Sequence, residues 1–325
     1  MKVHLLSCYP VREEPSVPEW LRLHSRSEHF ELTADPIDAE LILFAETYAG
    51  LDPYFLDVIR HPVFRRFTQK CVLYHISDIT QTLCRTISPS IDKNHSNLQC
   101  RRSFSYVVRA HDNPYLNQMA LADVPTRYLF SFVGDPNSHP IRSRILALER
   151  PDALLKAVTG TSATFMNESE RAPFQQGYLQ TILESQFVLC PRGHGPTSMR
   201  LFEVMQLGRV PVIIGDSWLP VSGIPWQEFA IFVPETEIEQ IPQILGTFRH
   251  RAIEMGARAR AVWGEHFSSH NAAMGLLERA CELLAVPYGR RERILDLMEL
   301  RSPSHWRILA ASVRRILLHG AAAVN

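Results

Sequence analysis

Residues 185–216 read SQFVLCPRGHGPTSMRLFEVMQLGRVPVIIGD and contain two apolar runs with a helical pattern between them. The first run, at 186–190, ends in a loop rich in proline and glycine. A polar segment then begins a helical pattern at 198–208, and the second run, at 210–216, ends at Gly-Asp. Short apolar runs separated by helical patterns are typical of parallel strands joined by crossover helices. The stretch therefore predicts a β–α–β unit.

The same alternation extends in both directions along the chain. It predicts strands at 2–8, 39–46, 70–77, 128–135, 153–158, 186–190, 210–216 and 229–235. It predicts helices at 18–27, 53–67 (interrupted at Pro62), 141–150, 176–185, 198–208 and 236–248. The stretch from 78 to about 125 is rich in Ser, Asn, Asp and Pro and is expected to be irregular.

The alternation predicts an α/β fold with two Rossmann-like domains and a ligand cleft between them. We expect an N-terminal domain at 1–125, a C-terminal domain at 126–285 and an amphipathic helical tail at 286–325. The tail segment WRILAASVRRILLHG is expected to close one domain, and peripheral contact with a membrane is the alternative.

The composition excludes several classes of protein. Lys plus Arg equals Asp plus Glu at 34 each, so no basic field favours nucleic acid. The six cysteines are scattered and lack the spacing of a zinc site, which favours reduced thiols in a reducing compartment. The first residues do not resemble a signal peptide, and no apolar run reaches the roughly 20 residues of a membrane-spanning helix. We expect a cytoplasmic protein, with the inner membrane face as a peripheral location.

The loop at 191–198 has the composition of an anion site. A strand that ends before a helix leaves backbone N–H groups for an anion, and Gly193 permits close backbone approach. Ser198 is expected to cap the helix, and Arg200 offers a bidentate donor to phosphate. Glu203 lies one turn further and suits ribose hydroxyls. The set indicates a nucleoside diphosphate pocket, although a helix cap and an Arg–Glu ion pair would need no ligand.

Residues 185–220, followed by PWQEFAIFVPE, resemble the signature region of exostosin-family glycosyltransferases. That family has a Cys-Pro-x-Gly loop, a Ser-x-Arg-x-x-Glu helix, a Gly-x-x-Pro-Val-Ile strand and a Trp-x-x-Phe segment in this order. The segment YLFSFVGDPNSHPIRSRIL at 128–146 resembles the family's Phe-x-Gly strand and the arginine helix after it. The likeness covers about 128–246 well and the first 125 residues only weakly.

The resemblance implies a GT-B fold, whose C-terminal domain holds the nucleotide sugar. By motif position Glu203 would bind the ribose, and Ser198 and Arg200 the diphosphate. Arg142 would add a second positive charge; Arg144 competes with it, and motif spacing favours Arg142. The remaining donor-site residues expected in the loop are Arg192, Gly193 and His194. The chain has no Asp-x-Asp triad, which agrees with a site that uses neither metal nor cofactor.

Transfer to a hydroxyl group requires a general base on the far side of the anomeric carbon. Glu46 and Asp78 each follow a predicted strand of the N-terminal domain, where active-site loops leave such sheets. Asp78 is slightly preferred, and both could instead cap the following segment. His75 and Asp112 are weaker options.

These features together predict an inverting, metal-independent glycosyltransferase. Its donor would be a UDP-sugar and its acceptor a hydroxyl of a glycan or polysaccharide. The inverting stereochemistry is implied by the family resemblance. The alternative is a non-catalytic module of the same fold that binds a nucleotide or a glycan.

Overall fold

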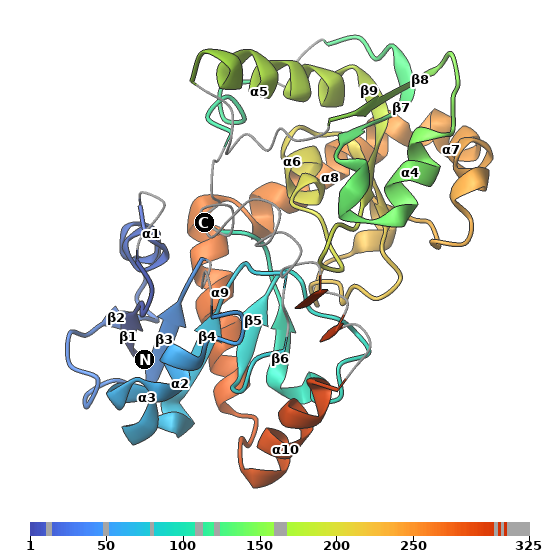
Figure 1. Ribbon diagram of the computed structural model, residues 1–325. Helices are drawn as coiled ribbons and strands as arrows, with labels where there is room; N and C mark the ends of the chain where they lie inside the picture. Colours follow the sequence, from blue (N-terminus) through green and yellow to red (C-terminus); the bar gives the residue numbers. More distant parts are fainter. Residues whose placement is uncertain are drawn as a thin grey trace. The chain divides into compact units, whose positions relative to one another are not determined.

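The computed structural model describes residues 1–10, 15–47, 52–78, 81–107, 113–119, 124–158, 168–301, 305–306 and 309–310. The chain forms two compact units, each built on one sheet (Figure 1). Unit 1 contains residues 1–110, 217–222 and 269–325, and unit 2 contains residues 111–216 and 223–268. The two parallel α/β units confirm the predicted fold class.

The sheet of unit 1 has six parallel strands in the order β2-β1-β3-β4-β5-β6. They are β1 (Lys2–Leu6), β2 (Glu31–Leu32), β3 (Leu41–Ala45), β4 (Cys71–Tyr74), β5 (Thr86–Ser88) and β6 (Arg101–Ser103). Every residue of β3 and β4 is buried, as their continuous apolar sequences require in a covered parallel sheet.

The helices of unit 1 come from both ends of the chain. They are α1 (Val17–His24), α2 (Leu56–Arg60), α3 (Pro62–Arg66), α9 (Ser269–Leu284) and α10 (Arg290–Glu299). His61 separates α2 from α3, next to the proline that the sequence marks as an interruption. Ser16 caps α1 and forms a capping box with Glu19.

The sheet of unit 2 has five parallel strands in the order β11-β10-β9-β7-β8. They are β7 (Tyr128–Gly134), β8 (Ala153–Ala157), β9 (Ser185–Pro191), β10 (Val210–Ile214) and β11 (Ile231–Phe232). Its helices are α4 (Pro140–Leu146), α5 (Glu168–Leu183), α6 (Arg200–Gln206), α7 (Ile241–Phe248) and α8 (Ala252–His266). Because all strands are parallel, β7, β9 and β10 end at one edge of the sheet.

Two predictions about organisation need correction. The stretch after residue 78 contains β5 and β6, which are three residues each and too short to produce an apolar period. The expected domain at 126–285 ends too late, because the chain rejoins unit 1 at Ser269. The apolar face of α9, with Ala273, Leu276 and Ala280 fully buried, packs on β3 to β6. Of the expected tail at 286–325, α10 is described and residues 311–325 lie outside the described part.

Candidate functional site

The end of β7 holds two arginines against one aromatic ring. The guanidinium carbon of Arg200 lies 4.8 Å from the centre of the Phe132 ring, and that of Arg142 lies 5.7 Å from it. Gly134 ends the strand beside them. A Cβ atom at Gly134 would lie 2.9 Å from the Phe132 ring and 3.2 Å from the Arg200 guanidinium. The Phe-x-Gly pattern in the sequence therefore corresponds to a ring and a gap that admit two cations.

Arg200 is buried, and its guanidinium points at the protein's own acceptors. Its Nη2 donates to the carbonyl of Val133, its Nε to the Tyr178 hydroxyl at 3.2 Å, and its Nη1 to the carbonyl of Leu189 at 3.5 Å. These contacts tie the first turn of α6 to β7 and β9. The sequence predicted that Arg200 would bind diphosphate. In this structure its hydrogen bonds position α6.

Glu203 follows one turn later and is held by a residue that the sequence pattern does not mark. The Tyr178 hydroxyl donates to Oε2 of Glu203 at 2.7 Å. Burial, with the Glu203 carboxylate beside it, raises the pKa of Tyr178 well above its usual range, so the phenol stays a donor. The sequence indicated only a helix at 176–185, and the period of that helix does not distinguish Tyr178 as a site residue.

Arg142, on α4, reaches the loop after β9. Its Nε donates to the carbonyl of Arg192 at 2.9 Å, and its Nη2 donates to the carbonyl of Pro191 at 3.3 Å. Arg144 instead forms a bidentate pair with Glu239, at 2.9 and 2.6 Å, on the surface. The structure thus brings Arg142 to the predicted loop and commits Arg144 elsewhere.

The loop residues lie where β9 and β10 end. Gly193 and His194 are half-buried, and a Cβ atom on Gly193 would lie 3.3 Å from Arg142 Nη2. The Arg192 guanidinium lies 3.9 Å from Glu235. At Gly215 a Cβ atom would come within 2.6 Å of the Pro196 carbonyl oxygen, so only glycine lets the loop pack on β10.

Ser198 does not cap the helix as predicted. α6 begins at Arg200, its N-cap residue is Met199, and no side chain makes the capping hydrogen bond. Ser198 is half-buried, and its carbonyl accepts from the Leu201 N–H at 3.1 Å in the preceding turn. The turn at 198–201 delays the helix by two residues, which the sequence pattern could not resolve.

The two preferred bases lie in unit 1 in different settings. Glu46 is 2% exposed, and its carboxylate accepts from the Ser7 hydroxyl at 2.7 Å and the Cys8 N–H at 2.6 Å. Burial raises the pKa of Glu46, while these hydrogen bonds act in the opposite direction. Glu46 therefore secures the loop that follows β1.

Asp78 is half-buried and follows the end of β4. Among the described residues no hydrogen bond or ion pair engages its carboxylate. His75, the weaker candidate, is fully buried. The centre of its ring lies 4.5 Å from the centre of the Phe55 ring. Burial and the charge of Arg101 lower the pKa of His75 to about 3. Asp112 lies outside the described residues.

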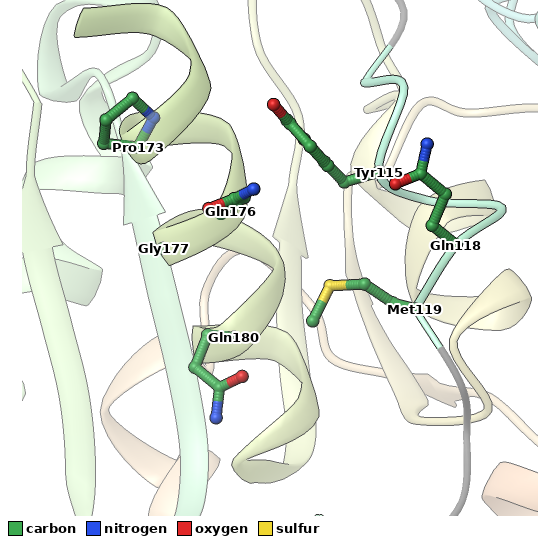
Figure 2. A pocket seen from close by; sticks show the side chains of 7 residues that line it. All are labelled: Tyr115, Gln118, Met119, Pro173, Gln176, Gly177 and Gln180. Atoms are coloured by element: carbon green, nitrogen blue, oxygen red, sulfur yellow. The ribbon is translucent and has the colours of Figure 1, made fainter.

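Unit 2 also has an open pocket of about 490 Å³ beside α5. Figure 2 shows Gln176 and Gln180 on α5 facing a segment that carries Tyr115, Gln118 and Met119. Every side chain that lines it is uncharged, so it lacks the cations that a diphosphate requires. None of the predicted donor residues lines this pocket.

Neither a metal cluster nor a membrane span is found in the described part of the chain. Within it, no three His, Cys, Asp or Glu side chains are grouped so that they could hold a metal ion. In the same residues, no helix has the length and apolar character needed to cross a membrane.

One protein family and several known proteins match the chain. The model of the exostosin GT47 domain matches residues 77–248, just over half of the chain. A probable glucuronosyltransferase 47 A of Physcomitrium patens is 37% identical over 183 residues, covering 52% of this chain and 37% of the relative. A probable glucuronoxylan glucuronosyltransferase of Arabidopsis thaliana is 37% identical over 154 residues, covering 45% of this chain and 32% of the relative.

The chain thus spans about a third of the length of these curated relatives. Among solved structures, a sucrose-phosphate synthase of Thermosynechococcus elongatus aligns with 76% of this chain and 74% of its own, at 13% identity and a TM-score of 0.41. The family assignment rests on the GT47 match, which spans β5 to α7 and includes Arg142, Arg200 and Glu203. The chain belongs to the exostosin GT47 family.

Proposed function

We propose that the protein is an inverting glycosyltransferase that moves a sugar from a UDP-sugar to a hydroxyl of a glycan or polysaccharide, without a metal ion. Membership of the exostosin GT47 family supports glycosyl transfer, as do relatives named glucuronosyltransferase and xylosyltransferase. One observation carries the donor half of the proposal: Arg142 and Arg200 share the Phe132 ring near the end of β7, and Tyr178 links Arg200 to Glu203.

In the proposed donor site Glu203 accepts hydrogen bonds from the ribose hydroxyls. Tyr178 orients the carboxylate by donating to Oε2, and Arg200 holds the Tyr178 oxygen in turn. A carboxylate fixed in this way can bind a diol without first losing side-chain freedom.

Arg142 and the loop at 191–194 form the part of the proposed site that binds the diphosphate. When the bond from the anomeric carbon to the diphosphate breaks, negative charge develops on the leaving oxygen. A guanidinium stabilises that charge if it is already in place, because no reorganisation is then needed. Arg142 is held at the loop by the carbonyls of Pro191 and Arg192. Arg200 is a positioning residue here, and its buried charge adds to the positive potential.

The proposed general base is Asp78. In an inverting transfer the base removes the acceptor proton as the acceptor oxygen attacks opposite the leaving diphosphate. Asp78 is more accessible than Glu46, whose carboxylate is engaged by the loop after β1.

A calorimetric titration with UDP and a hydrolysis screen over UDP-sugars test this proposal. Wild-type protein should bind UDP and hydrolyse at least one UDP-sugar, and Glu203→Ala should weaken UDP binding by about 1–3 kcal/mol. Activity should persist in EDTA. Tight UDP binding without turnover of any sugar would identify a binding module, and activity that EDTA abolishes and manganese restores would contradict the metal-free site.

A further inference from the structure

Helix α10 buries its acidic side chains. Glu292, Asp296 and Glu299 follow the i, i+4, i+7 spacing of one helix face and are only 8%, 1% and 9% exposed. The usual amphipathic helix turns its apolar side chains inward and its charges outward. In α10 the inward face is acidic.

Each buried carboxylate has partners that fix the orientation of the helix. Asp296 lies 2.7 Å from Arg101 Nη2 in a fully buried ion pair, and Tyr288 donates to its other oxygen at 2.7 Å. Glu299 accepts from the Ser96 N–H at 3.0 Å, and Glu292 accepts from the Gly289 N–H at 2.8 Å. Removing these contacts would leave buried charges unpaired, so α10 cannot simply rotate to hide its apolar side.

The outward face of α10 carries large apolar side chains. Ile294, Leu297 and Met298 are 48%, 52% and 57% exposed and lie within one turn of each other. Single exposed apolar residues are common on protein surfaces, but three neighbours on a helix whose acidic residues face inward form a continuous patch.

The charge around this patch is positive. All three arginines of α10, Arg290, Arg291 and Arg293, are exposed, while all three of its acids are buried. On α3, exposed Arg65 shares the lining of a pocket of about 470 Å³ with Arg293 and Leu297. Among the described residues no ion pair joins Arg65 or Arg293 to a carboxylate.

We propose that the outward face of α10 docks on a lipid bilayer that contains anionic phospholipids. Ile294, Leu297 and Met298 would enter the boundary between headgroups and acyl chains, and Arg290, Arg293 and Arg65 would contact the lipid phosphates. The charge complementarity favours a bilayer over a second copy of the chain, because a two-fold contact between α10 helices would bring arginines together.

Co-sedimentation of the 325-residue chain with vesicles tests the proposal. Vesicles of phosphatidylcholine with phosphatidylglycerol should retain the wild-type protein, and pure phosphatidylcholine should retain far less. Ile294→Ser/Met298→Ser should lower the partition coefficient by roughly tenfold or more, because it removes the inserted side chains. Arg290→Gln/Arg293→Gln should lower it about fivefold per arginine, most clearly at low salt.

The matched control is Leu23→Ser/Ile253→Ser, which removes two exposed apolar side chains from α1 and α8. This control should bind vesicles like the wild type, and thermal melts should show that every variant is folded. An equal loss of vesicle binding in the control would indicate nonspecific hydrophobic adsorption and would overturn the proposal. The proposal would also be overturned if the wild-type protein did not bind anionic vesicles. It would be overturned as well if the wild type formed a dimer in the ultracentrifuge and Ile294→Ser/Met298→Ser dissociated that dimer.

Discussion

The phenolic oxygen of Tyr178 lies 2.7 Å from Oε2 of Glu203, in a hydrogen bond that joins α5 to α6. The same oxygen accepts from Arg200 Nε at 3.2 Å. The proposed ribose carboxylate is therefore held through a tyrosine that is itself fixed by the buried arginine.

Tyr178→Phe should weaken UDP binding by about 1 kcal/mol, because the Glu203 carboxylate loses the donor that orients it. Isothermal titration with UDP measures the loss. Tyr128→Phe, at the start of β7, is the control, since no hydrogen bond of its hydroxyl is present among the described residues. Unchanged affinity in Tyr178→Phe would remove this hydrogen bond from the proposed site.

Arg200→Lys should lower the free energy of unfolding by about 2–4 kcal/mol. Lysine keeps the charge, but one ammonium cannot serve the acceptors on β7, α5 and β9 that the guanidinium reaches. Urea denaturation gives the difference. Arg144→Lys, on a surface pair with Glu239, should change it far less, because solvent screens an exposed ion pair. Similar small losses in both variants would show that Arg200 is not a structural residue.

Asp78→Asn should reduce turnover by roughly 100-fold or more and leave the melting temperature unchanged, as expected for loss of a general base. Glu46→Gln should have the opposite profile. Its unfolding free energy should fall by about 1–3 kcal/mol, since its carboxylate accepts from Ser7 and Cys8. Single-turnover transfer assays and thermal melts on both variants decide the assignment. A stable Glu46→Gln protein without turnover would make Glu46 the base.

His75→Phe should reduce the sensitivity of the protein to acid. Burial lowers the pKa of His75 to about 3 in the folded state, so between that value and its ordinary pKa the unfolded chain binds the extra proton. His75 therefore makes stability fall as pH falls, by up to about 1.4 kcal/mol per pH unit. The variant should lose this slope in urea titrations between about pH 6 and pH 4.

His95 contributes in the same direction, because burial lowers its pKa to about 2, so the slope should shrink without vanishing. His250→Phe, on an exposed side chain, is the control and should leave the slope as it is. An unchanged slope in His75→Phe would contradict a buried neutral imidazole.

The sequence by itself determined the α/β class, most of the strands and the family. Buried parallel strands must be apolar throughout, so β3, β4, β9 and β10 are visible as runs without any knowledge of their neighbours. The donor motifs are equally local, since the loop and first turn of α6 lie within 13 residues of the end of β9.

Only the tertiary structure decided which side chains are buried and which distant residues they contact. Arg200 meets the carbonyl of Val133, 67 residues away, and no local pattern reveals that its guanidinium is engaged there. The same holds for α10, where Asp296 on the buried acidic face is paired with Arg101, 195 residues earlier in the chain. Local periodicity reports which side chains share a face. Whether that face is buried depends on the charges that the rest of the chain brings to it.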